Sequence, residues 1–397
     1  MSNVPKLRFK EFSGEWEKGT LKDFGTFYYG KSAPKSSVTK DATTPCVRYG
    51  ELYGTYKEII KEIKSYTNID SDNLKLSKGG EILIPRVGEN PLDFANCSYL
   101  PMSKVAIGEM ISVYNTKENG LFFTFYINGM LKKQFAKVVE GGNVSNLYFR
   151  YLENIEVNIP IKQEQQKIAS FLVTLSTKIE QLTKKESLLQ YYKKGVMQKI
   201  FNQEIRFKAD DGSEFCEWEK EKLNKYLVEY KNKSFYENEY PVLTSSNKGL
   251  MLQSDYFGEN RLTERDNIGF NIVPSNFITY RSRSDNRTFT FNINTLGYTG
   301  IISTYYPVFE CKNAENRFIV TLLNKNKHFI GKYSVGTSQT VLSFNELKNI
   351  RMFIPSLEEQ TKIANFLSSI DKKIEVTKIE LEKTKEFKKA LLQQMFV

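Results

Sequence analysis

The chain is poor in the residues that most catalytic and metal centres use. Its 397 residues include one histidine, His328, and four cysteines, none of them in a CxxC pair. A single histidine excludes His-rich metal centres and disfavours a histidine-based triad. Isolated cysteines argue against zinc ribbons and redox dithiols, and are typical of reduced thiols in a cytosolic protein. We therefore predict no metal site, and we interpret His328 as a surface or packing residue.

Further absences concern membranes and two enzyme classes. No apolar run approaches the roughly 18 residues of a membrane span, and the first twelve residues have no apolar signal core. We therefore expect a cytoplasmic protein without a membrane partner. No proline is followed by proline or aspartate, which excludes the [DNS]PP[FYW] element of amino-methyltransferases and the PD…(D/E)xK nuclease pattern. We expect no catalytic residues in this chain.

The charge of the chain favours an anionic partner. The formal net charge is +11, and such an excess most often accompanies nucleic acid binding. The excess is spread along the whole chain, so it is a weak indication of where such a partner binds.

The sequence contains a tandem repeat. Residues 152–201 align without a gap with residues 347–396, at an offset of 195, and 19 of these 50 positions are identical. The openings of the two halves also match, and they place the only tryptophans, Trp16 and Trp218, at the same point. We predict two bodies, 1–151 and 202–346, each followed by a similar tail, 152–201 and 347–397. We interpret the tryptophans as rigid anchors beneath each body.

Each tail has the pattern of a long helix. Apolar residues recur at alternating steps of four and three, and no proline follows Pro160 or Pro355. This spacing is a heptad seam and favours a coiled coil over ordinary core helices. Ser356 and Glu359 predict a capping box at the start of the second helix. The predicted seam consists of Ile168, Leu172, Leu175, Ile179, Leu182, Ile363, Leu367, Ile370, Ile374 and Leu381.

The bodies have a mixed pattern. Short β-rich runs such as EILIP (81–85) and NFITY (276–280) alternate with polar turns that contain glycine and asparagine. Apolar runs of helical length, 122–135 and 316–329, lie near the end of each body. We predict an α+β fold for both.

One motif resembles a phosphate-binding loop. Residues 25–32, GTFYYGKS, satisfy GxxxxGK[ST]. The segment that follows contains two prolines and no apolar helical face, and the matching LVEYKNKS keeps Lys233 and Ser234 but neither glycine. We interpret Lys31, Ser32, Lys233 and Ser234 as parts of basic loops near DNA, not as a nucleotide site.

Arginine, asparagine and small polar residues gather in two loops of the second body. Arginine can contact guanine bidentately and asparagine or glutamine suits adenine, whereas lysine and serine more often contact phosphates. A solvated charged loop is the alternative for this segment. Matching residues at the same offset add Arg86 opposite Arg281 and Lys137 opposite Lys332, and each arginine is either an internal ion-pair residue or a DNA contact. The predicted DNA-contacting set is completed by Asn143, Arg283, Asn286, Arg287, Ser338 and Gln339.

The duplicated segments IPIKQEQQKIASFL (159–172) and IPSLEEQTKIANFLSSID (354–371) resemble the DNA-specificity subunits of type I restriction–modification systems. The resemblance covers the whole chain as an architecture. It implies two target recognition domains joined by two long helices that form an antiparallel coiled coil, with internal pseudo-two-fold symmetry.

The resemblance also implies a function and partners. Each body would read one half of an asymmetric, bipartite site on double-stranded DNA. The helices would dock two modification (methyltransferase) subunits, with restriction (translocase–nuclease) subunits joining them. S-adenosylmethionine, ATP and magnesium would belong to those partners, with no cofactor in this chain. Two alternatives stay open: a coiled-coil adaptor that binds proteins without reading DNA, and a self-sufficient DNA-modifying enzyme.

Overall fold

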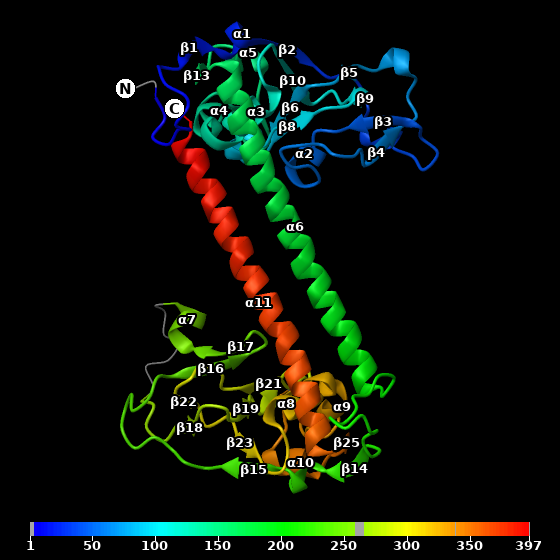
Figure 1. Cartoon of the computed structure of the whole chain (residues 1–397), viewed down its shortest axis with the longest axis vertical. Helices are drawn as coiled ribbons and strands as arrows, with labels where there is room; N and C mark the ends of the chain where they lie inside the picture. The colour runs from blue at the N-terminus through cyan, green and yellow to red at the C-terminus, as the bar shows by residue number, and fades with distance from the viewer. Residues whose placement is uncertain (1–3, 259–265, 338, 397) are drawn as a thin grey trace. The chain divides into compact units, whose positions relative to one another are not determined.

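The computed structural model describes residues 4–258, 266–337 and 339–396. The chain forms two compact units, Met1–Glu186 with Thr377–Val397, and Ser187–Val376. Two long helices, α6 (Lys162–Phe201) and α11 (Leu357–Gln394), each contribute one part to each unit (Figure 1). The end of α11 therefore lies in the same unit as the N-terminal segment, where the amide of Leu7 donates to the carbonyl of Gln394 at 2.9 Å.

The first unit contains two four-stranded sheets. The central sheet has the antiparallel order β2-β10-β6-β8, and the second has the order β4-β3-β9-β5, with β3 and β9 parallel. The central strands are β2 (Gly25–Tyr29), β10 (Ile111–Thr116), β6 (Glu81–Pro85) and β8 (Ser98–Leu100), and the others are β4 (Ser65–Thr67), β3 (Thr44–Val47), β9 (Ser103–Ile107) and β5 (Leu76–Lys78). Smaller pairings join β1 (Glu17–Thr20) to β13 (Glu156–Ile159), and β11 (Glu140–Gly141) to β12 (Ser145–Asn146) to β7 (Val87–Gly88). The helices are α1 (Leu21–Phe24), α2 (Glu51–Gly54), α3 (Gly120–Met130), α4 (Lys132–Lys137) and α5 (Phe149–Leu152).

The second unit repeats this plan with shorter strands. Its central sheet has the antiparallel order β15-β23-β19-β21, formed by β15 (Leu227–Tyr230), β23 (Val308–Cys311), β19 (Ile278–Tyr280) and β21 (Phe291–Ile293). Two-stranded pairs are β16 (Leu243–Ser246) with β17 (Gly249–Leu252), β18 (Asn271–Val273) with β22 (Gly300–Ile302), β20 (Arg283–Ser284) with β24 (Thr340–Val341), and β14 (Glu219–Lys222) with β25 (Arg351–Ile354). The helices are α7 (Gln253–Phe257), α8 (Asn316–Lys325), α9 (Lys327–Gly331) and α10 (Phe344–Asn349). The predicted α+β class is confirmed for both bodies.

One apolar helix of each unit lies where the sequence has an apolar run of helical length, and it packs against the central sheet. In α3, the run from Phe122 to Ile127 is buried on every side, which suits a helix enclosed by its own body. In α8 the buried residues are confined to one face, Phe318, Ile319, Leu322 and Leu323. Both helices belong to the main apolar core of their unit.

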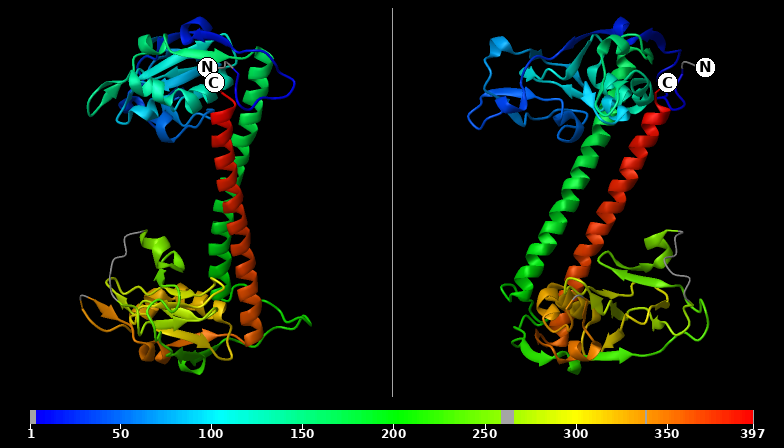
Figure 2. Two further views of the ribbon diagram at one scale, coloured as in Figure 1. Left: turned by 90° about the vertical axis from the view of Figure 1, so that its left-hand side faces the viewer. Right: turned by 180° about the vertical axis from the view of Figure 1, so that it is seen from behind.

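The last turns of the long helices complete these cores. Just beyond α11, Phe396 stacks on Tyr126 with ring centroids 5.2 Å apart and meets Trp16 edge to face at 6.5 Å. At the end of α6, Phe201 meets Trp218 edge to face at 6.0 Å. Figure 2 shows the red end of α11 beside the blue N-terminal segment of the first unit in both views. Each tryptophan is thus an anchor for the end of a long helix as well as for its body.

The predicted seam is only partly a coiled-coil seam. Eight of its ten residues are buried, whereas Ile179 and Ile374 are half-buried. The early members of each helix belong to the core of a body instead, including Leu172 in the first unit and Leu367 in the second. The heptad spacing did not separate these two roles, because both place apolar residues on one helix face.

Within each unit the two long helices run antiparallel. In the first unit Lys178 of α6 pairs with Glu380 of α11 at 2.9 Å, and in the second Lys193 pairs with Asp371 at 2.5 Å. Higher numbers on α6 therefore face lower numbers on α11. These pairs lie at exposed positions, so they set alignment more than they add stability.

The glutamates of the repeated motif bind arginines from the start of each body. Glu164 accepts two hydrogen bonds from Arg8, at 2.8 and 2.7 Å, and Glu359 accepts two from Arg206, at 3.2 and 3.0 Å. Of the two hydrogen bonds of the predicted capping box, one is present and the other is wrong. The Ser356 hydroxyl accepts from the amide of Glu359 at 3.3 Å, but the Glu359 carboxylate is directed to arginine and not back to Ser356.

The glutamines of the same motif hold the start of the apolar helices. The side chain of Gln360 donates to the carbonyl of Pro355 and accepts from the amide of Glu315, the N-cap of α8. In the first unit Gln165 donates to Pro160 and accepts from the amide of Asn119, the N-cap of α3. The motif thus fixes the angle between each long helix and its body.

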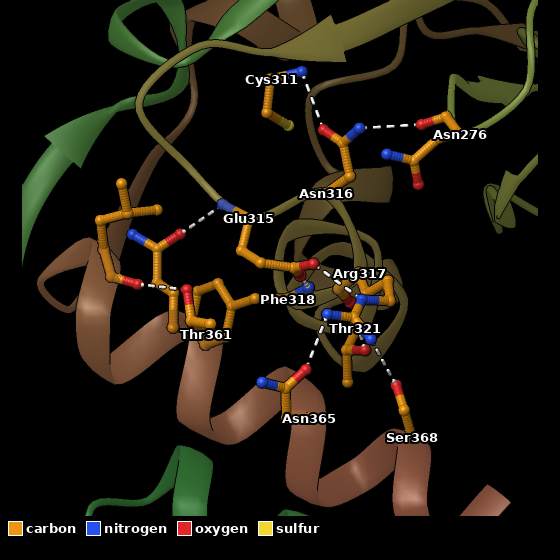
Figure 3. Close-up of polar contacts among 12 residues, drawn as sticks. Asn276, Cys311, Glu315, Asn316, Arg317, Phe318, Thr321, Thr361, Asn365 and Ser368 are labelled. Carbon is orange, nitrogen blue, oxygen red and sulfur yellow. Dashed lines mark hydrogen bonds and ion pairs between the residues drawn. The ribbon is translucent and has the colours of Figure 1, made fainter. Parts of the chain in front are cut away.

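Arg317 adds a second connection between α8 and α11. Its guanidinium donates to Glu315 at 2.7 Å, to Asn365 at 2.9 Å and to Ser368 at 3.4 Å, so one side chain bridges the two helices (Figure 3). These contacts hold the start of α8 against α11 within the second unit.

Candidate nucleic-acid interface

The central strands set the correspondence between the two bodies. Leu83 of β6 pairs with Val113 of β10, and Thr279 of β19 pairs with Val308 of β23. Val113 and Val308 are 195 positions apart, as in the helical tails, whereas Leu83 and Thr279 are 196 apart. The segment that carries the arginines is therefore shifted by one residue between the bodies.

This shift corrects the predicted equivalence of Arg86 and Arg281. In the structure Arg281 corresponds to Pro85, and Arg86 corresponds to Ser282. The amide of Arg86 donates to the carbonyl of Met110 at 3.0 Å, and the amide of Ser282 donates to the carbonyl of Tyr305 at 2.9 Å. Met110 and Tyr305 are 195 positions apart, which confirms the match. A one-residue slip along a strand exchanges its two faces, so the two arginines have different surroundings.

Arg86 is held by aromatic rings. Its guanidinium lies 4.6 Å from the ring centroid of Tyr29 and 5.9 Å from that of Tyr148, and it approaches the Met110 sulfur at 3.4 Å. Its Nε is buried with no hydrogen-bond partner among the described atoms. The internal ion pair that was one alternative is not found among the described residues, and stacking holds the side chain instead.

Arg281 and Arg283 lie in an open crevice of the second unit. We call it the second crevice, after the unit that contains it. It consists of two adjoining hollows that share Thr244, Phe257, Arg281, Arg283 and Tyr306. Both arginines are exposed, and the Arg283 guanidinium lies 4.1 Å from the ring centroid of Tyr305. Burial raises the pKa of the Tyr306 hydroxyl, and the nearby charge of Arg281 opposes that shift.

These two arginines are available to an external anion. The arginines that form ion pairs in the described part of the chain are Arg8, Arg150, Arg206 and Arg317. Neither Arg281 nor Arg283 forms such a pair. A guanidinium that is exposed, stacked and not neutralised suits contact with a base edge or a phosphate.

The other predicted residues of the second body differ in how far hydrogen bonds within the chain already occupy their side chains. Asn286 and Gln339 line the second crevice, but the Asn286 side-chain oxygen accepts from Ser284 and Thr288 within its own turn. Gln339 donates weakly to Asp285 at 3.4 Å. Arg287, at a positive φ of 55°, donates to the carbonyl of Gly336 at 3.4 Å and does not line the crevice. Ser338 lies outside the described residues.

The first unit has a crevice at the corresponding place. Cys46 pairs with Ala106 in parallel, as Val242 does with Ile301. The residues that follow these pairs line a hollow in both bodies. In the first unit this first crevice is lined by Ala33, Pro34, Lys35, Arg48, Tyr49, Gly50, Gly108, Glu109 and Met110, and in the second unit the matching positions include Thr244, Ser245, Ser303, Thr304 and Tyr305.

Arg48 is the residue that sequence reasoning missed. It lines the first crevice, is half-buried, and has an Nε without a hydrogen-bond partner among the described atoms. Its counterpart is Thr244, so no residue identity pointed to it. The shared proline before each pair, Pro45 and Pro241, was the available signal, but the loops before these prolines differ in length.

The lysine–serine pairs are placed near these crevices without forming a phosphate loop. Residues 25–29 are the strand β2, and Ser32 is followed by a three-residue 3-10 helix, Lys35–Ser37, where a phosphate loop would continue directly into an α-helix. Ser32 has a positive φ of 63°, and its carbonyl accepts from Glu109. In the second unit Lys233 is exposed, whereas Ser234 is buried and donates to the carbonyl of Asn267. Ser234 is therefore a structural residue.

The remaining predicted residues lie on a hairpin of the first unit or at helix ends just before equivalent hairpins. Asn143 is exposed between β11 and β12, and Lys137 and Lys332 are exposed where α4 and α9 end. The hairpins turn at Gly141 and Gly336, with φ of 115° and 112°, and an added Cβ would lie 2.8 or 2.6 Å from a backbone carbonyl. Neither lysine lines a crevice, so the structure does not bring these residues together with Arg281.

The described residues contain neither a candidate metal site nor a candidate membrane-spanning helix. Residues 4–258, 266–337 and 339–396 contain no group of three potential metal-ligating side chains. No helix in this part of the chain combines the length and the apolar character needed to cross a membrane.

The family of the chain follows from a match that covers both repeats. The model of the type I restriction modification DNA specificity domain matches residues 13–190 and 213–386. The chain therefore belongs to this family and is a DNA sequence-recognition subunit of a type I restriction–modification system. Specificity subunits are not catalytic, and they act in complexes with DNA and with other subunits of these systems.

Individual relatives agree with this assignment. The type I restriction enzyme MjaVIII specificity subunit of Methanocaldococcus jannaschii is 25% identical, over 97% of this chain and 94% of that protein. The putative MjaX specificity subunit of the same organism is 24% identical, over 63% of this chain and 60% of that protein. The crystal structure of the type I S subunit from M. genitalium has a TM-score of 0.62 at 14% identity, covering 99% of both chains. A structure concerned with complex assembly and conformational transition of the type I R-M system has a TM-score of 0.51 at 14% identity, over 96% of this chain and 97% of that one.

Proposed function

We propose that each body reads one half of an asymmetric, bipartite site on double-stranded DNA through its crevice. The bodies comprise residues 1–151 and 202–346, and the tails 152–201 and 347–397 carry the scaffolding. The observation that supports this proposal is the placement of the crevices. They follow the same strand pairing in both units but present Arg48 in the first and Thr244, with Arg281 and Arg283, in the second. One scaffold with different linings suits two different half-sites.

The long helices hold the partners in this proposal. Two modification subunits dock on the helices, and restriction subunits join the assembled complex. Those partners bind S-adenosylmethionine, ATP and magnesium, and the complex works in the cytoplasm. Exposed apolar side chains on α6, Leu188, Tyr191 and Tyr192, are consistent with a protein surface docking there.

Methylated adenines in DNA from cells with and without this gene test the proposal. We expect a gene-dependent, two-part motif whose halves differ. An exchange of the first-crevice side chains Lys35, Arg48 and Tyr49 for alanine should relax one half only, and Lys22→Ala, an exposed change outside both crevices, serves as the control. A protein adaptor without DNA reading would leave methylation unchanged, and its DNA binding would not weaken steeply with added salt.

A further inference from the structure

Two aromatic side chains of the second unit stand out from an ordered turn. Phe235 is 78% exposed and Tyr236 is 72% exposed, and they are adjacent in sequence. Most proteins bury such rings, because leaving them in water forgoes the gain from removing their apolar surface. The two rings are therefore candidates for a contact with a partner.

The turn that carries these rings is held on both sides. Before it, the buried Ser234 exchanges backbone hydrogen bonds with Phe270 and Gly269. After it, Asn238 and the buried Asn267 form two hydrogen bonds of 2.7 Å between their groups. The Glu239 carboxylate accepts from the amide of Phe235 at 2.6 Å. A turn fixed in this way presents the rings with little conformational entropy left to lose on binding.

The turn lies at the rim of the second crevice. A hollow lined by Asn238 and Pro241 shares Val242, Gln253 and Phe257 with the crevice that contains Arg281. The turn is thus continuous with the surface proposed to read DNA.

The first unit supports this placement. There, the loop between Ser32 and Pro45 occupies the corresponding stretch, and it lines the first crevice through Pro34 and Lys35. That loop contains no aromatic residue. The aromatic pair is therefore a property of the second body alone.

The charge of the turn does not suit it to contact with phosphates alone. Lys231 and Lys233 are balanced by Glu237 and Glu239 within residues 231–240, so the segment has no net charge. Contact with phosphates alone would favour an excess of lysine or arginine. Ring faces suit the faces of bases, which stack on aromatic side chains irrespective of sequence.

We propose that Phe235 and Tyr236 form an aromatic wedge that stacks against a base step at the edge of the half-site read by the second body. The proposal rests on the DNA-reading function of the crevice and adds a contact that deforms the duplex. Apolar wedges of this kind unstack one base step and kink the helix. The wedge would couple the deformability of that step to recognition, without a hydrogen bond to a base edge.

Fluorescence of 2-aminopurine tests the wedge. Duplexes that carry the methylation-mapped site, with 2-aminopurine at successive positions of the half-site that Arg281→Ala alters, are bound to the full chain in complex with its modification subunits. The wild type should raise fluorescence at one edge step. The double variant Phe235→Ala/Tyr236→Ala should lose that signal and bind about tenfold more weakly, a typical effect of removing base stacking. Its dependence on salt should be unchanged, because no phosphate contact is lost.

Controls separate the possible failures. Phe353→Ala removes another exposed ring of the same unit, on β25, and should bind as the wild type does. Phe235→Leu/Tyr236→Leu keeps apolar bulk without ring faces, so it should retain part of the fluorescence signal, as an apolar wedge does, and lose the affinity that stacking adds. A wild type that shows no site preference would contradict the proposed function. A wild type with normal preference, together with a double variant of unchanged affinity and fluorescence, would overturn the wedge alone.

Discussion

Arg8 reaches the carboxylate of Glu164 with two nitrogens, at 2.8 and 2.7 Å, across 156 positions of sequence. The Glu164 side chain is fully buried, whereas that of Arg8 is 13% exposed. Arg206 and Glu359 repeat this pair in the second unit. In each pair the hydrogen bond to the glutamate carboxylate raises the pKa of the arginine, so both arginines stay charged throughout the accessible pH range.

We predict that Arg8→Ala destabilises the first unit by about 3–5 kcal/mol, because it leaves a buried carboxylate without its partner. Arg8→Lys should recover part of this loss, since lysine cannot bind both oxygens in the same plane. Hydrogen exchange of first-unit amides measures the effect. Lys18→Ala breaks an exposed pair with Glu156 and should cost less than about 1 kcal/mol. Equal effects of the two alanine variants would contradict the role given to Arg8.

A second prediction concerns the helix ends. Phe396 is 4% exposed and packs on Tyr126 and Phe122, so Phe396→Ala should cost about 3–5 kcal/mol. Phe201→Ala should cost less, because Phe201 is half-buried. Faster hydrogen exchange should be confined to the first unit for Phe396→Ala and to the second unit for Phe201→Ala. Exchange that accelerates in the opposite unit would show that these rings do not close the cores that contain them.

The two arginines predicted as equivalent should now behave differently. Arg281→Ala should weaken DNA binding by about 1–3 kcal/mol and relax one half-site, because an exposed crevice cation is lost. Arg86→Ala should instead lower the free energy of unfolding by about 0.5–2 kcal/mol, because it removes stacking on Tyr29. Melting temperature and half-site preference measure both effects. Arg351→Ala, an exposed arginine outside the second crevice, controls for loss of charge. A half-site change caused by Arg86→Ala without loss of stability would reverse this assignment.

A fourth prediction concerns the thiols. Burial raises the pKa of Cys46 to about 11 and that of Cys311 to about 12, while Cys216 is exposed. The thiolate is the reactive form, so a raised pKa lowers reactivity at pH 8. Iodoacetamide under native conditions should therefore label Cys216 well before Cys46, Cys97 or Cys311, as read by peptide mass spectrometry. Early labelling of Cys311 would indicate that the second body opens locally.

The repeated tails and the apolar runs were readable from the sequence because their signals are local. Heptad spacing predicted one long helix in each tail, 152–201 and 347–397, and the structure has these helices at Lys162–Phe201 and Leu357–Gln394. The apolar run at 122–135 predicted the helical stretch that forms α3 and α4. The repeated glutamate and glutamine marked the family. Their roles were not readable, because each depends on a partner far away in the sequence, such as Arg206 for Glu359.

The candidate interface depended much more on tertiary structure. Arg281, Arg283, Asn286 and Gln339 were named from residue type, and strand pairing then placed them around one crevice. The same inspection grouped Lys332 with them, although it lies where α9 ends and outside the crevice. Residue type indicates which chemistry is available, but not which side chains share a surface.

The sequence alone determined the duplication, the helical tails, the α+β class and the family, because each is written in local periodicity or in repeated identity. Tertiary structure decided which residue of one body matches which residue of the other. Thirty positions separate Leu83 from Val113, whereas 29 separate Thr279 from Val308. This difference of one residue leaves composition and periodicity unchanged, yet Arg86 lies against aromatic rings and Arg281 lies in the second crevice. Only the hydrogen-bond register of a sheet fixes that difference, because side chains along a strand alternate between its two faces.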